Sequence, residues 1–158
     1  MTVALRYLDR PDWPAGQWSD EPDLEVWTDE FTGYRCLILR TSMGNLCGYV
    51  EVPDSHPWHG LDYSSPTDGS TPDPDNYEFH NRIDGKVGVH GGLTFAGDRG
   101  QVVGSGWWFG FDCAHAWDLV PTMLRDGYHS QAESSYRDIA YVREECGKLA
   151  RQLAEVTA

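Results

Sequence analysis

Basic residues are scarce in this chain, and one long stretch has none. The 158 residues include 12 Lys and Arg against 25 Asp and Glu, so the formal net charge is −13. No Lys or Arg occurs from Thr41 to Asn81. Because affinity for DNA and RNA depends on cations that neutralise phosphates, we expect no direct nucleic-acid binding. An acidic inhibitor that mimics nucleic acid and blocks a basic partner stays open as an interpretation.

Two further features are missing: closely spaced cysteines and long apolar runs. The four cysteines form no C-x-x-C pair, which argues against a zinc ribbon and a dense disulfide framework. Cys36 and Cys47 could face each other across a hairpin, although buried thiols are the commoner case. No segment approaches the roughly 20 apolar residues of a membrane-spanning helix, and the N-terminal residues lack an apolar export signal. We expect a cytoplasmic protein with no membrane partner.

Aromatic residues, by contrast, are abundant. They make up 13% of the chain, which has seven tryptophans. Large, stiff aromatic side chains serve a thick core, a stacking pocket or an interface, and an interface would make the chain a homo-oligomer. A length of 158 residues is typical of one domain, so residues 1–158 are predicted to form a single unit.

The middle of the chain predicts β-structure. Tyr34–Arg40 and Leu46–Val52 are rich in β-branched and large residues, and the turn Met43–Asn45 between them indicates a hairpin. Val87–Phe95 and Trp107–Phe111 are predicted as two more strands, with glycines that mark a bulge or a close approach to the backbone.

The C-terminal part predicts an amphipathic helix. From Ile139 onward, apolar residues recur at steps of three and four up to Val156, and Ser135 precedes Asp138 at the spacing of a capping box. Strands followed by a final helix indicate an α+β fold: a mostly antiparallel sheet with the C-terminal helix packed on one face.

A long polar loop separates the hairpin from the later strands. Residues 53–76 are acidic and contain five prolines. Loops of this length without their own structure are uncommon unless they are lids, binding loops or disordered. The sequence leaves open whether this loop is a lid or a simple excursion from the domain.

The segment Gly104–Asp118 (GSGWWFGFDCAHAWD) places reactive groups at the end of an apolar strand. Asp112, His115 and Asp118 lie three residues apart, on one side of a helical turn if one begins at Asp112. They could bind a divalent metal, or Asp112 could orient His115 as a general base. In the structural interpretation, Asp112 only caps a turn and His115 donates to a backbone carbonyl.

His90, Gly91 and Gly92 form a second short motif. If the two strands are neighbours, His90 and His115 could cleave a phosphodiester without metal, one as base and the other as acid. The glycines would expose N–H groups to an anion. Arg99 would add a cation, and Trp107, Trp108 and Phe111 would stack on a base. Cys113 is a weaker candidate nucleophile, because sequence neighbours on a strand point to opposite faces.

Three motifs carry a resemblance to a known family. HGGLTFAG (90–97), GWWFGFDCAHAWD (106–118) and the helix YRDIAYVREECGKLARQL (136–153) resemble an uncharacterised family of small phage and actinobacterial proteins, over about residues 34–155. The resemblance implies a phage or mobile-element setting, with the host cytosol as location, and implies no activity. Trp117 departs from the small residue expected there.

Three functional hypotheses follow from these patterns. The first is a counter-defence hydrolase that binds a small nucleotide signal and cleaves its phosphodiester with His90, His115 and Asp112. The second is a nucleotide-binding sponge that uses the same pocket without turnover. The third is the acidic inhibitor, in which both histidines are bystanders.

Overall fold

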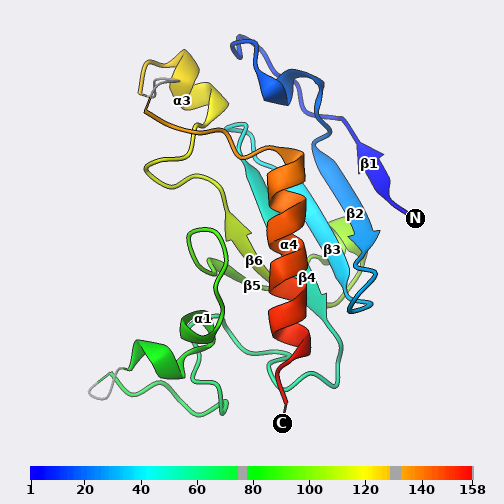
Figure 1. Cartoon of the computed structure of the whole chain (residues 1–158), viewed down its shortest axis with the longest axis vertical. Helices are drawn as coiled ribbons and strands as arrows, with labels where there is room; N and C mark the ends of the chain where they lie inside the picture. Colours follow the sequence, from blue (N-terminus) through cyan, green and yellow to red (C-terminus); the bar gives the residue numbers. More distant parts are fainter. Residues whose placement is uncertain (75–77, 129–132, 158) are drawn as a thin grey trace.

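The computed structural model describes residues 1–74, 78–128 and 133–157. In these ranges six strands form one antiparallel sheet in the order β1-β2-β3-β4-β6-β5 (Figure 1). The strands are β1 (Val3–Leu5), β2 (Leu24–Thr28), β3 (Arg35–Arg40), β4 (Leu46–Val52), β5 (Phe95–Gly97) and β6 (Trp107–Asp112). The helices are α1 (Ile83–Lys86), α2 (Gly100–Val103), α3 (Pro121–Arg125) and α4 (Ile139–Ala154), with 3-10 turns η1 (Gln17–Asp20) and η2 (Phe79–Asn81). The predicted α+β fold is confirmed.

The predicted hairpin is strands β3 and β4, which pair with Cys36 opposite Val50. Gly44 has φ +104 in the turn between them, a conformation that favours glycine. The predicted strand 107–111 is β6, which lies on the other side of β4. Cys36 and Cys47 face opposite sides of the sheet, so the two thiols do not meet across the hairpin, and all four cysteines are free.

The prediction of a strand over Val87–Phe95 is wrong except at its last residue. Only Phe95–Gly97 pairs with β6. Gly91 and Gly92 have φ values of +66 and +83, which break an extended strand, and the peptide N–H of His90 donates to Glu145 Oε1 instead of to a neighbouring strand. Residues 87–94 are therefore a loop that a helix side chain holds.

Helix α4 packs on the face of the sheet formed by β3 and β4 (Figure 1), as its apolar periodicity predicts. Its buried residues are Ile139, Val142, Glu145, Cys146, Leu149, Ala150 and Leu153. The capping box is wrong in detail: Asp138 itself is the N-cap, and its Oδ1 accepts from the Tyr141 N–H at 2.8 Å. Cys146 of the helix packs directly on Gly48 of β4.

The opposite face of the sheet has a smaller apolar cluster around Leu37, Tyr49 and Trp108. Arg99 lies over this cluster, with its guanidinium 4.3 Å from the Tyr49 ring centroid and 4.0 Å from that of Phe95. Its Nη2 also donates to the Tyr49 hydroxyl at 2.6 Å. The segment that joins β5 to β6 therefore covers the part of this face around Tyr49 and Phe95.

The long loop is anchored at several points. His56 Nε2 donates to the Leu153 carbonyl at the C-terminal end of α4, because His56 Nδ1 accepts from the Trp58 N–H. Further along, the peptide N–H groups of Ile83 and Asp84 donate to carbonyls of residues 65 and 63. The described part of the loop therefore packs against α1 and η2; residues 75 and 76 lie outside the described ranges. Within those ranges, no helix is both long and apolar enough to cross a bilayer.

The close approach of α4 to β4 gives a testable pair of substitutions. A Cβ at Gly48 would lie 2.5 Å from the Phe111 ring and 2.8 Å from Cys146 Sγ, whereas a Cβ at Gly147 on α4 meets nothing closer than 3.6 Å. We expect Gly48→Ala to lower the free energy of unfolding by about 1–3 kcal/mol through overpacking. Gly147→Ala should raise it by about 0.5–1 kcal/mol, since alanine is the better helix former.

Urea unfolding followed by circular dichroism measures both changes. Equal effects of the two substitutions would contradict the packing of α4 on Gly48.

Candidate functional site

Titratable side chains from three segments meet near the end of β6. The loop 87–94 supplies one, the last residue of β6 and the turn after it supply three, and the segment that leads into α4 and its first turns supply three. We call this set the His90 cluster: His90, Asp112, His115, Asp118, Arg137, Tyr141 and Glu145. Functional sites concentrate ionisable groups in clefts and buried surroundings, so this cluster is a candidate.

Asp118 is the centre of the cluster, and its side chain is completely buried. One oxygen accepts from His90 Nε2 at 2.8 Å and from the His115 N–H at 3.0 Å, and the other accepts from Arg137 Nε at 2.9 Å. Burial alone would raise the pKa of Asp118, but the bonds from His90 and Arg137 outweigh it and lower the pKa. Asp118 is therefore an ionised carboxylate that only accepts hydrogen bonds.

His90 is fixed from both sides of its ring. Its Nε2 bonds Asp118 and its Nδ1 lies 2.7 Å from the Tyr141 hydroxyl. Its peptide N–H donates to Glu145 Oε1 at 3.0 Å. Only 6% of the side chain is exposed. The backbone and the ring plane of His90 are thus set by helix α4 and by the turn after β6.

His115 lies beside His90, with 5.7 Å between the two ring centroids. Its side chain is 24% exposed. Its Nε2 is 3.3 Å from Asp112 Oδ1, close enough for an ion pair but not aligned as a hydrogen bond, and this buried atom has no hydrogen-bond partner in the described part of the chain. The ring stacks on Trp117 at 6.0 Å between centroids, and Trp117 is 56% exposed.

The turn after β6 is not the helical turn that would place its acids together. Asp112 Oδ1 accepts from the Ala114 N–H at 3.2 Å, so this carboxylate caps the turn, as the structural interpretation expects. Asp118 faces His90 and Arg137 rather than sharing a site with Asp112. Among the described residues, no three His, Cys, Asp or Glu side chains are arranged to hold a metal, which includes the set Asp112, His115 and Asp118.

The aromatic residues expected to stack on a ligand are separated by the sheet. Trp108 is fully buried on the Arg99 side, and Phe111 is 1% exposed on the α4 side. Trp107 is partly buried, and its Nε1 donates to the Leu61 carbonyl at 3.0 Å. These rings are core residues in this structure. Arg99 stacks on the opposite face from α4 and takes no part in the His90 cluster.

Cys113 lies in the core under α4, with 2% of its surface exposed. Burial, reinforced by the charge of Asp118, raises the pKa of its thiol well above the usual range. A protonated, buried thiol is a poor nucleophile, so nothing in the geometry supports cysteine catalysis here.

Sequence reasoning missed the contribution of the helix and of the residue before it. Tyr141 and Glu145 are one helical turn apart beside the apolar stripe, and Arg137 precedes the N-cap. A usable signal existed: Glu145 sits between Val142 and Cys146, where the periodicity places the buried face, and a buried acid there needs a partner. The partner, the His90 N–H, could not be read from the sequence.

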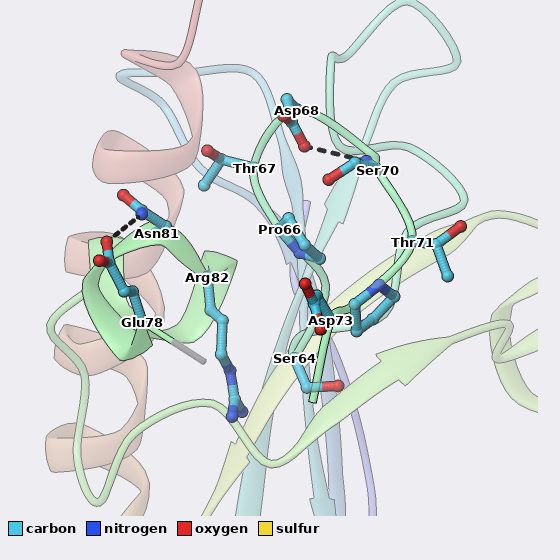
Figure 2. Close-up of a pocket in the computed structure, with 11 residues that line it drawn as sticks. Ser64, Pro66, Thr67, Asp68, Ser70, Thr71, Asp73, Glu78, Asn81 and Arg82 are labelled. Carbon is cyan, nitrogen blue, oxygen red and sulfur yellow. Dashed lines mark hydrogen bonds between the residues drawn. The ribbon is translucent and has the colours of Figure 1, made fainter. Parts of the chain in front are cut away.

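A separate cavity of about 450 Å³ lies between the long loop and η2. Figure 2 shows Glu78 and Asn81 on one side of it and Asp68, Ser70 and Thr71 on the other. Its lining includes no residue of the His90 cluster. This cavity and the concentrated chemistry are therefore in different places. We favour the His90 cluster as the functional site, because the cavity is lined by exposed polar groups that ordinary solvation explains.

The two glycines after His90 provide a matched test of the site. Both have left-handed φ, but a Cβ on Gly91 would lie 1.9 Å from His115 Nε2, while a Cβ on Gly92 meets nothing within 4 Å. We expect Gly92→Ala to destabilise the fold by about 1–2 kcal/mol from backbone strain alone. Gly91→Ala should cost at least about 1 kcal/mol more and displace the His115 ring.

Urea unfolding measures the loss in the free energy of unfolding, and the imidazole NMR signals of His115 report the displacement of its ring. If both variants leave those signals in place, His115 does not pack on Gly91.

Comparisons with other proteins assign no family to this geometry. No protein-family model, no curated protein and no solved structure matches the chain. The resemblance carried by the HGGLTF and GFDCAH motifs, and the phage setting that it implies, therefore stay predictions. The functional argument rests on the residues of the His90 cluster themselves.

Proposed function

We propose that the His90 cluster is the active site of a hydrolase that cleaves a phosphodiester in a small nucleotide-like ligand. The observation that carries the proposal is a pair of imidazoles 5.7 Å apart in unlike environments. His90 is buried against the Asp118 carboxylate, whereas His115 is partly exposed and has a nitrogen without a hydrogen-bond partner among the described residues. Unlike environments are how one site obtains both a base and an acid.

In this proposal His90 takes up a proton and His115 delivers one. Asp118 orients the His90 ring and stabilises the imidazolium that forms, as a buried carboxylate does beside a catalytic histidine. Asp112, 3.3 Å from His115 Nε2, is placed to do the same for the second ring. General acid and base groups of this kind each contribute about 10²–10⁴-fold to a rate.

Three features beside the histidines suit an anionic, aromatic ligand. Gly91 and Gly92 carry no side chains, although the Gly92 N–H is not available to an anion as expected, because it donates to the Val89 carbonyl at 2.8 Å. Arg137 supplies a cation whose side chain is 24% exposed. The exposed face of Trp117 offers the stacking surface that Trp108 and Phe111, being buried, do not. A hydrolase of this kind would suit the expected phage setting, as a counter-defence protein that removes a nucleotide signal of bacterial immunity.

Two other functions stay in competition. A nucleotide-binding sponge would use the same residues without turnover. The acidic inhibitor is favoured by a different observation. Residues 54–78 hold six acidic residues and no Lys or Arg. Those that the structure describes are all exposed: Asp54, Asp62, Asp68, Asp73 and Glu78. That surface resembles the phosphate array that a basic partner would bind.

One experiment separates the three. The purified protein is incubated with a panel of cyclic and linear nucleotides, with and without EDTA, and the products are read by mass spectrometry. We expect one compound to be consumed, and His115→Ala to lower its turnover at least about 100-fold while retaining binding. His80→Ala is the matched control, because the side chain of His80 is 74% exposed and lies outside the cluster.

The other outcomes are equally definite. A compound recovered intact from the denatured protein identifies a sponge and contradicts catalysis by His90 and His115. If the protein neither consumes nor retains any nucleotide, the result favours the acidic inhibitor.

A further inference from the structure

His90 has no free ring nitrogen with which to deprotonate an incoming hydroxyl. Its Nε2 is taken by Asp118, and the partner of its Nδ1, at 2.7 Å, is the hydroxyl of Tyr141. If His90 is a base, the first hydroxyl that it can deprotonate is therefore one that the protein itself supplies.

The direction of the two hydrogen bonds follows from Asp118. An ionised carboxylate only accepts, so the proton of this pair sits on His90 Nε2. In the neutral ring Nδ1 is then bare, and it accepts from the Tyr141 O–H. The order hydroxyl, imidazole, carboxylate is the arrangement that activates a hydroxyl nucleophile in catalytic triads.

The surroundings of Tyr141 suit attack on an anionic group. The Arg137 guanidinium lies over its ring, 5.0 Å from the centroid, while also holding Asp118. Burial, with the charge of Glu145, raises the pKa of Tyr141, so the hydroxyl is protonated at neutral pH and needs a base. Tyr141 lies in the first turn of α4, where the helix dipole favours negative charge.

We propose that Tyr141 is the nucleophile of the His90 cluster and forms a covalent phosphotyrosyl intermediate. The inference rests on the proposed function and adds to it the group that attacks phosphorus. A tyrosine nucleophile limits the substrates to phosphodiesters whose phosphorus can reach the Tyr141 oxygen. The ligand itself then needs no attacking hydroxyl.

The step balances with groups already in the cluster. Tyr141 Oη bonds to phosphorus, its proton passes to His90 Nδ1, the P–O bond to the leaving group breaks, and the leaving oxygen takes a proton from His115. Water then attacks phosphorus and gives a proton to His115. The Tyr141 oxygen leaves and recovers its proton from His90, so one water is consumed per turnover.

The direct test uses diisopropyl fluorophosphate, which phosphorylates activated hydroxyls with loss of fluoride. We expect one adduct on the wild-type protein, mapped to Tyr141 by peptide mass spectrometry. His90→Gln should slow this labelling at least about 10-fold, since it removes the base. Tyr128→Phe, which changes an exposed tyrosine outside the cluster, should leave it unchanged.

The nucleotide panel supplies the second readout. Tyr141→Phe should lower the turnover of any consumed nucleotide at least about 100-fold, and an acid-quenched reaction of the wild type should carry the phosphotyrosyl adduct. Because the adduct is mapped on the wild-type protein, that readout does not depend on the folding of any variant.

The failures are distinguishable. Full turnover by Tyr141→Phe, or labelling elsewhere but not at Tyr141, overturns the nucleophile while the hydrolase stands. Labelling of Tyr141 with no nucleotide consumed overturns the proposed substrate class and keeps the reactive tyrosine.

Discussion

The buried carboxylate of Asp118 is the interaction on which the candidate site depends. A charge without access to water is tolerated only when hydrogen-bond donors satisfy it, and Asp118 has donors from His90, His115 and Arg137. These donors belong to the loop 87–94, to the turn after β6 and to the residues before α4. One carboxylate therefore joins three segments that are far apart in the sequence and sets the position of both histidines.

A second buried ion pair shows how a buried carboxylate can serve the fold alone, away from the candidate site. Arg40 and Asp23 are both fully buried, 3.0 Å apart, and Arg40 also donates to the Tyr136 hydroxyl. The pair holds the N-terminal segment against the sheet and the start of α4, and Nε of the neighbouring Arg10 is, like His115 Nε2, a buried nitrogen without a hydrogen-bond partner among the described residues. The His90 cluster differs, because it brings two imidazoles together and keeps His115 and Arg137 partly exposed.

The parts of the fold that local patterns determine could be predicted. The hairpin of β3 and β4 and the helix α4 follow from turn residues and apolar periodicity. Strand β2 was missed because it is short and carries Glu25 inside its run, and its pairing with β3 decides its conformation. The stretch Val87–Phe95 was predicted as a strand interrupted by its glycines, but Glu145 takes the His90 amide that a strand would have paired.

The candidate site was predictable in its residue types and not in its connections. The sequence placed His90, His115 and Asp118 in two motifs, and the structure brings both motifs together. Alternation along the strand already puts Trp108 and Phe111, three residues apart, on opposite faces, but the sequence could not indicate which of these faces α4 covers, or that Tyr141 of the helix completes the cluster. Such contacts depend on which face of each strand lies against α4. The pairing of strands across the sheet determines that face, and no local sequence pattern does.

The central claim is the proton order Tyr141 O–H to His90 Nδ1, and His90 Nε2–H to Asp118. Long-range ¹H–¹⁵N NMR of the imidazole of His90 at pH 8 measures it most directly, because the two ring nitrogens have distinct shifts when only one carries a proton. The account predicts a neutral ring with the proton on Nε2 and Nδ1 as an acceptor. A ring that carries its proton on Nδ1, or that exchanges freely between the two forms, would contradict it.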